Sequence, residues 1–137
     1  MIANLVGYVV TAVVFLGLDA IWLSQMGQRL YKPVLGESML DKPLLAPAGI
    51  FYLIYIFGVC FFAVWPAAKA GSLGKAATSA AVLALVAYAT YDLTNQATLR
   101  VWSVRLTVAD LAWGVFVTTL AASVGYWAMT AAASRLR

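Results

Sequence analysis

Three aspartates lie inside long apolar runs of this sequence: Asp19, Asp92 and Asp110. They are three of only five acidic residues in the chain. An aspartate at the centre of a membrane helix costs about 2.5 to 3.5 kcal/mol on insertion scales, unless it is protonated, is paired or faces a wet cavity. A carboxyl group in such a place can bind a cation, carry a proton or act as a general acid or base. The sequence therefore indicates a polar site built around these three residues.

Each aspartate has an aromatic residue three or four positions away, a spacing that puts both side chains on one helix face. Aromatic faces and carboxylates together suit an organic cation. We therefore predict a ligand-binding site formed by these residues and their polar neighbours: Asp19, Trp22, Tyr88, Tyr91, Asp92, Asn95, Asp110 and Trp113. Arg100 and Arg105 join this set, because the connection that carries them lies within a few helical turns of Asp92 and Asp110.

Each of these residues also has a purely structural interpretation. Asp110 could interact with the positive end of its own helix. Asp19 could extend toward the membrane interface, and the two arginines could anchor helix ends. For any single residue the two interpretations carry about equal weight. Around Asp92, however, further hydrogen-bonding side chains cluster, and there the polar site is the favoured interpretation.

The elements that carry these residues are four apolar runs. Hydrophobic residues make up 64% of the 137 residues and charged residues only 10%, far from the composition of soluble domains. Each run reaches the roughly 20 residues that cross a hydrocarbon core; the runs span residues 2–24, 44–65, 76–98 and 106–132. Lipid offers backbone groups no partner, so each run must be helical, and short connections make successive helices antiparallel. We predict one all-α integral membrane domain over residues 1–137, a four-helix up-down-up-down bundle.

Smaller patterns predict how the helices are connected and packed. In the connection 25–43, Pro33 and Gly36 predict that no helix continues through it. Small residues recur at four-residue spacing from Ala76 to Ala84 and from Ala121 to Gly125, which predicts close helix contacts there. The third run carries the most hydrogen-bonding side chains, so we expect it in the middle of the bundle.

The parity of four helices places all three aspartates in one leaflet. The first and third runs head toward the first and third connections, and Asp19 and Asp92 lie in their last thirds. The fourth run leaves from that same side, with Asp110 in its first two turns. The second run begins there, so Tyr52 and Tyr55 can reach the same level. We expect this leaflet to hold the polar site and the other to be plain apolar packing.

Charge and residue types argue against several functions. The net charge is +4, but the nine Lys and Arg are scattered singly, unlike the basic stripe of a nucleic-acid-binding protein. The chain has no histidine and one cysteine, which excludes haem and zinc sites built on those ligands. Three dispersed aspartates are sparser than the usual oxygen-ligand site for a hard cation. We predict no metal, no cofactor and no nucleic-acid partner.

Lys and Arg are nearly balanced between the two sides of the bundle. Four lie on the side of the termini, Arg137 among them, and five lie on the other side. Such a balance does not decide orientation and is also what a dual-topology homodimer would show. We favour cytoplasmic termini because the terminal side carries no acids. The first run is expected to stay as a span, because it is longer than a signal core and no Lys or Arg precedes it.

Three motifs match a known family: Asp19 with Trp22-Leu23, Tyr91-Asp92-Leu93-Thr94-Asn95, and Asp110 with Trp113-Gly114. Through them the chain resembles a bacterial family of small, predicted four-span membrane proteins of unknown function. The resemblance covers essentially the whole chain. It implies a multi-pass protein of the bacterial inner membrane and brings no established activity.

Three functions remain open at this point. The favoured hypothesis is a protein that binds or transports a small cationic or lipophilic ligand. The second is a membrane-embedded enzyme that modifies lipids or isoprenoids, with an aspartate as general acid or base, although no nucleophile is evident. The third is an accessory or assembly subunit, although polar contacts between membrane helices contribute only about 1 kcal/mol each. The expected partners are the lipid bilayer, such a ligand and a second copy of the chain.

Overall fold

The computed structural model describes residues 1–136 and is helical almost throughout, with no strand in that range. Arg137, counted above on the terminal side, lies outside the described residues. In chain order the elements are α1 (Ile2–Met26), the π-helical η1 (Gly27–Tyr31), α2 (Lys32–Leu35), the 3-10 turn η2 (Gly36–Ser38), α3 (Leu45–Val59), the π-helical η3 (Cys60–Val64), α4 (Trp65–Ala70), α5 (Leu73–Thr98) and α6 (Val104–Arg135).

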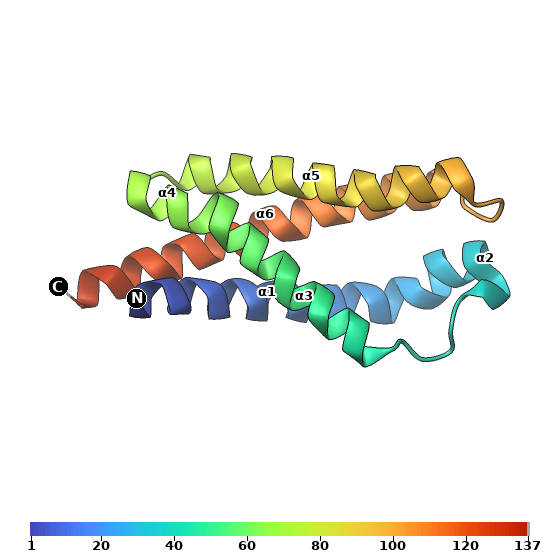
Figure 1. The fold of residues 1–137 in the computed structure, drawn as a ribbon, viewed down its shortest axis with the longest axis horizontal. Helices are drawn as coiled ribbons and strands as arrows, with labels where there is room; N and C mark the ends of the chain where they lie inside the picture. The colour runs from blue at the N-terminus through green and yellow to red at the C-terminus, as the bar shows by residue number, and fades with distance from the viewer. Residues whose placement is uncertain (137) are drawn as a thin grey trace.

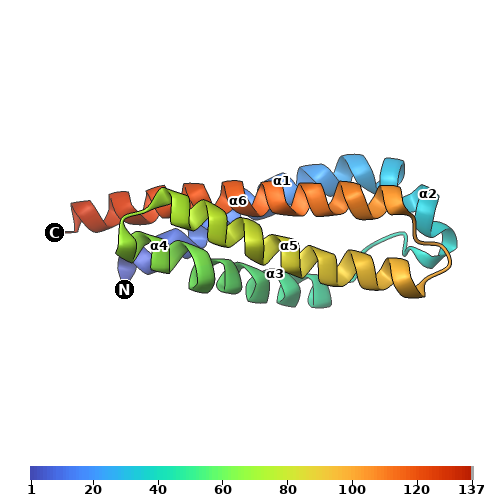
Figure 2. The same ribbon diagram turned by 90° about the horizontal axis from the view of Figure 1, so that it is seen from above.

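These elements make four helical rods that are long and apolar enough to cross a membrane: 2–38, 45–70, 73–98 and 104–135. Successive rods run in opposite directions, and both termini lie at the end away from α2 and the 99–103 connection (Figures 1 and 2). The prediction of an all-α membrane bundle of four spans is confirmed.

The first rod continues well past its predicted end, and Pro33 does not interrupt it. Pro33 lies in the first turn of α2, a position that tolerates proline. Directly before it, the chain widens into the π turn η1. The second rod repeats this arrangement, because η3 ends two residues before Pro66. Of the two residues expected to break the helix, Pro33 does not and Gly36 does: the first rod ends around Gly36, whose φ of 55° is left-handed.

The centre of the bundle is α6, so the prediction that the third span lies in the middle is wrong. α6 packs along both α1 and α5 and has buried residues on almost every turn. The outer face of α5 holds Thr90, Thr94 and Thr98, each of which donates its hydroxyl to a backbone carbonyl four residues earlier. A threonine satisfied in this way can face lipid, so polar content alone did not force α5 inward.

Small residues make the closest helix contacts, at the predicted positions. Ala76, Ala80 and Ala84 are fully buried on α5. On α6, a Cβ added to Gly125 would lie 2.0 Å from Thr11 Oγ1 of α1. Close approach of this kind is how membrane helices gain packing energy without a hydrophobic driving force. These contacts hold α1, α5 and α6 together in the half of the bundle near the termini.

The other half is more open because the second rod leaves its neighbours. At η3 this rod packs against α5 and α6, whereas α3 slants away and contacts α1 (Figure 1). The space between α3, α5 and α6 therefore widens toward the end that carries α2. Tyrosine side chains and the three aspartates lie in this half.

A tyrosine and carboxylate pocket between the four rods

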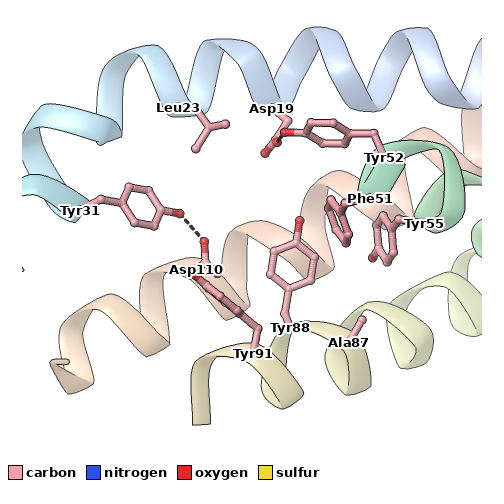
Figure 3. Close-up of a pocket in the computed structure, with 10 residues that line it drawn as sticks. All are labelled: Asp19, Leu23, Tyr31, Phe51, Tyr52, Tyr55, Ala87, Tyr88, Tyr91 and Asp110. Atoms are coloured by element: carbon pink, nitrogen blue, oxygen red, sulfur yellow. Dashed lines mark hydrogen bonds between the residues drawn. The ribbon is translucent and has the colours of Figure 1, made fainter. Parts of the chain in front are cut away.

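A pocket of about 350 Å³ occupies the open half of the bundle. All four rods contribute to its wall, which Figure 3 shows in close-up. Two carboxyl groups, four tyrosines facing them and one further tyrosine at the rim dominate the lining, which consists of Asp19, Leu23, Tyr31, Phe51, Tyr52, Tyr55, Ala87, Tyr88, Tyr91 and Asp110. No Lys or Arg is among these lining residues. The pocket wall is therefore acidic and aromatic.

Asp19 of α1 is held by donors from two other rods. Tyr52 of α3 donates its hydroxyl to Oδ2 at 2.5 Å, and Trp113 of α6 donates its indole N–H to Oδ1 at 3.0 Å. Each carboxylate oxygen thus accepts one hydrogen bond, and only 8% of the residue is exposed. Both donors need an acceptor, so these two bonds tie α1 to α3 and to α6 through the carboxyl group of Asp19.

Asp110 of α6 has a comparable partner on the other side of the pocket. Tyr31 of η1 donates its hydroxyl to Asp110 Oδ1 (Figure 3). The indole N–H of Trp22 donates to the same Tyr31 hydroxyl at 3.0 Å. Trp22 also stacks on Trp113, with ring centroids 4.6 Å apart and an interplanar angle of 6°. The stacked indoles therefore connect the two carboxyl groups. Trp113 bonds to Asp19 directly, and Trp22 bonds to Tyr31, the partner of Asp110.

Asp92 of α5 differs from the other two aspartates. It is fully buried, and neither of its carboxyl oxygens has a hydrogen-bond partner within standard geometry among the described residues. Its side chain lies next to Asp110, near enough for the two carboxyl groups to interact directly. Asp92 does not line the pocket; it lies behind Asp110.

The aromatic walls are fixed by packing and by a further hydrogen bond. The ring of Tyr88 lies directly on Gly114, where an added Cβ would come within 2.4 Å of it, and its hydroxyl points into the pocket (Figure 3). Tyr55 shares a hydrogen bond of 2.9 Å with the buried hydroxyl of Thr118. Phe51 stacks on Tyr55 with centroids 5.5 Å apart. These rings are held in place without a ligand.

The structure brings together most of the residues predicted for the site. Four line the pocket, namely Asp19, Tyr88, Tyr91 and Asp110. Trp22 and Trp113 lie behind them as hydrogen-bond donors.

The remaining predicted residues lie outside the pocket wall. Asn95 is half-buried, one turn beyond Asp92 on α5. Arg100 and Arg105 are exposed, and in residues 1–136 neither forms an ion pair with an aspartate.

Sequence reasoning missed Tyr31, Leu23, Phe51 and Ala87 as lining residues. Tyr31 is the most important omission, because the connection that carries it was expected to be irregular. Aromatic residues are common throughout this sequence, so the residue type of Tyr31 was no signal by itself. Tyr52 and Tyr55 were expected at this level and are part of the wall.

A family model described as "Predicted membrane protein (DUF2177)" matches residues 4–127. The chain belongs to this family. The resemblance inferred from the three aspartate motifs is thereby confirmed. Among curated proteins and solved structures, no match was found. The protein is a multi-pass membrane protein of a family whose function is unknown.

The chemistry open to this pocket follows from its wall. Ionised carboxyl groups and electron-rich ring faces both attract positive charge. Within residues 1–136, no cluster of three or more His, Cys, Asp or Glu side chains has the arrangement of a metal site. Carboxyl groups and ring faces arranged in this way suit contacts with a compact organic cation.

Proposed function

We propose that this protein binds, and carries across the membrane, a small cationic or lipophilic ligand that occupies the pocket between the four rods. The observation that supports this most is the presence of Asp19 and Asp110 on opposite walls, with tyrosine rings around them (Figure 3). A volume of about 350 Å³ is within the range of small-molecule sites.

Electrostatics favour a cation over a neutral or anionic ligand. Both carboxylates face the pocket, and no basic side chain in its lining offsets them. In a medium of low dielectric constant, a charge interaction is several times stronger than in water. Tyrosine faces add cation–π attraction of about 0.5 to 2 kcal/mol.

Access is from the side of the bundle. Phe51 of α3 and Tyr91 of α5 both line the pocket and are 51% and 53% exposed. They mark an opening at the surface of the four-rod bundle, in the region where α3 has slanted away from α5. In a bilayer this surface faces lipid, which suits a ligand that partitions into the membrane.

Calorimetry on the purified protein with benzyltrimethylammonium tests the proposal. This probe combines a permanent charge with one aromatic ring, and neopentylbenzene is its uncharged isostere. We expect the cation to bind at least roughly tenfold more tightly than the isostere, equivalent to about 1.4 kcal/mol.

The matched variants are Asp110→Asn, which removes a pocket carboxylate, and Asp41→Asn, which removes an acid that is 98% exposed outside the pocket. Asp110→Asn should weaken binding of benzyltrimethylammonium, and Asp41→Asn should not. Equal affinity for cation and isostere, or no binding of either, would refute a cation site.

Residence in the bacterial inner membrane and self-association belong to the same proposal. Fractionation of bacterial membranes after expression should place the chain in the inner membrane. Light scattering of the detergent-solubilised protein should give the mass of a dimer, as expected if two copies assemble around one transport path. A monomer would restrict the ligand path to the single pocket described above.

A further inference from the structure

Asp92 is the buried polar side chain that the proposed cation site leaves unexplained. It is fully buried in the contact between α5 and α6, and both of its carboxyl oxygens lack a hydrogen-bond donor among the described residues. An ionised carboxyl group with no donor and no counter-charge is one of the most costly groups to bury. A neutral, protonated carboxyl group avoids most of this cost.

Within residues 1–136, the groups that act on Asp92 include no Lys or Arg. Asp110 faces it from α6, and Tyr91 lies beside it on its own helix. Asp110 in turn faces Tyr31 of η1 and Asp19 of α1. Two adjacent carboxyl groups repel each other when both are ionised, so such a pair holds one proton between them.

The hydrogen bonds indicate which member of the pair carries the proton. Tyr31 donates to Asp110 Oδ1, which stabilises Asp110 as an acceptor. Asp92 receives no such bond. The negative charge therefore belongs on Asp110, which faces the pocket, and the proton on Asp92 behind it.

We infer that Asp92 and Asp110 form a proton-binding site, and that a cation entering the pocket beside Asp110 displaces the proton of Asp92. The second half of this inference rests on the proposed function. A cation at Asp110 offsets the repulsion that keeps Asp92 protonated, so the O–H bond of Asp92 breaks and its proton is released to the surrounding solution. One positive charge enters and one leaves, and the total charge of the site is conserved.

Infrared spectroscopy tests the first half without any ligand. The C=O stretch of a protonated carboxylic acid is distinct from the bands of a carboxylate. We expect wild-type protein at neutral pH to show the protonated band, Asp92→Asn to lose it, and the matched surface variant Asp41→Asn to keep it. A wild-type spectrum without the band, or a band that Asp92→Asn retains, would overturn the inference.

Adding benzyltrimethylammonium to wild-type protein tests the second half and needs no folded variant. We expect the protonated band to disappear while carboxylate bands grow at constant pH. Calorimetry in two buffers of different ionisation enthalpy should count about one proton released per cation, since each bound charge displaces one. The affinity of the wild type should therefore fall as pH falls, by roughly tenfold per unit while Asp92 is protonated.

Asp92→Asn should bind the cation roughly tenfold more weakly, because one carboxylate is missing from the occupied site. It should also release no proton, and its affinity should no longer depend on pH. Binding to wild type without proton release overturns the exchange. No binding at all, with the protonated band present, overturns the proposed function and the exchange with it, while the protonated Asp92 stands.

Discussion

Tyr31 donates a hydrogen bond to Asp110 across 79 residues of sequence. This contact ties the end of the first rod to the start of the central helix α6 and closes the pocket on the side of α2. The same hydroxyl accepts the indole N–H of Trp22. The Tyr31 hydroxyl therefore links Asp110 to Trp22. Trp22 stacks on Trp113, which bonds to Asp19.

Tyr31→Phe should lower the free energy of unfolding by about 1 to 2 kcal/mol, because it removes a buried donor and a buried acceptor at once. Denaturant unfolding in mixed micelles measures the change. The matched control is Tyr8→Phe, since the Tyr8 hydroxyl makes only one exposed bond of 3.3 Å to the carbonyl of Leu53. Equal losses in both variants would show that the Tyr31 hydroxyl has no special structural role.

Asp19 should tolerate substitution in a defined order. Asn keeps one acceptor oxygen and leaves one of the two donors, Tyr52 or Trp113, without a partner. Leu leaves both without one. We expect Asp19→Leu to be less stable than Asp19→Asn by about 1 kcal/mol, measured by the same unfolding assay. If Asp19→Leu matched the wild type, the two bonds would not contribute to stability.

Gly114→Ala should both destabilise the bundle and weaken ligand binding. The added Cβ would overlap the ring of Tyr88, so this ring, which is part of the pocket wall, must shift. Overpacking of this kind costs about 1 to 3 kcal/mol. Gly58→Ala is the control, because a Cβ on Gly58 meets nothing within 4 Å and alanine favours a helix over glycine. Binding of benzyltrimethylammonium unchanged in Gly114→Ala would contradict the position of Tyr88 in the pocket wall.

The contact between α1 and α6 should show compensation between two substitutions. Gly125→Ala places a Cβ 2.0 Å from Thr11 Oγ1, so either the Thr11 hydroxyl gives up its bond to the Gly7 carbonyl or the helices separate, at a cost of about 1 to 3 kcal/mol. Adding Thr11→Ala removes the overlapping oxygen and should restore part of this loss. The remaining Gly7 carbonyl at 3.2 Å keeps the restoration incomplete. A double variant no more stable than Gly125→Ala alone would place the two residues out of contact.

The sequence predicted the candidate site as far as local spacing allows. Four lining residues were predicted from their positions in apolar runs. The up-down order of the four spans then placed them at one end of the bundle; they are Asp19, Tyr88, Tyr91 and Asp110. Parity depends only on how many spans the chain has, so it does not require knowledge of helix rotation or crossing angle. Arg100 and Arg105 were included for closeness along the chain, yet the structure leaves them exposed. Closeness in sequence did not predict which way those side chains point.

Tyr31 shows why the rest could not be read from the sequence. In an unbroken α-helix, a residue twelve positions after Asp19 would point roughly 120° away from it. A π turn takes in one extra residue, which brings Tyr31 to within roughly 20° of the Asp19 direction. The π turn η1 ends two residues before Pro33, as η3 ends two residues before Pro66. A proline inside a run predicts a break in the helix rather than one extra residue, so local spacing did not predict the direction of Tyr31.

The sequence by itself determined that this is a four-span helical membrane protein with its acids gathered at one end. Those properties follow from the length of apolar runs and from the need of backbone groups for partners in lipid, both of which are local. Only the tertiary structure decided that α6 is central, that Tyr31 meets Asp110, and that Asp92 is left without a donor. Each of these depends on how whole helices rotate, slant and approach one another, and such contacts join residues far apart in the chain.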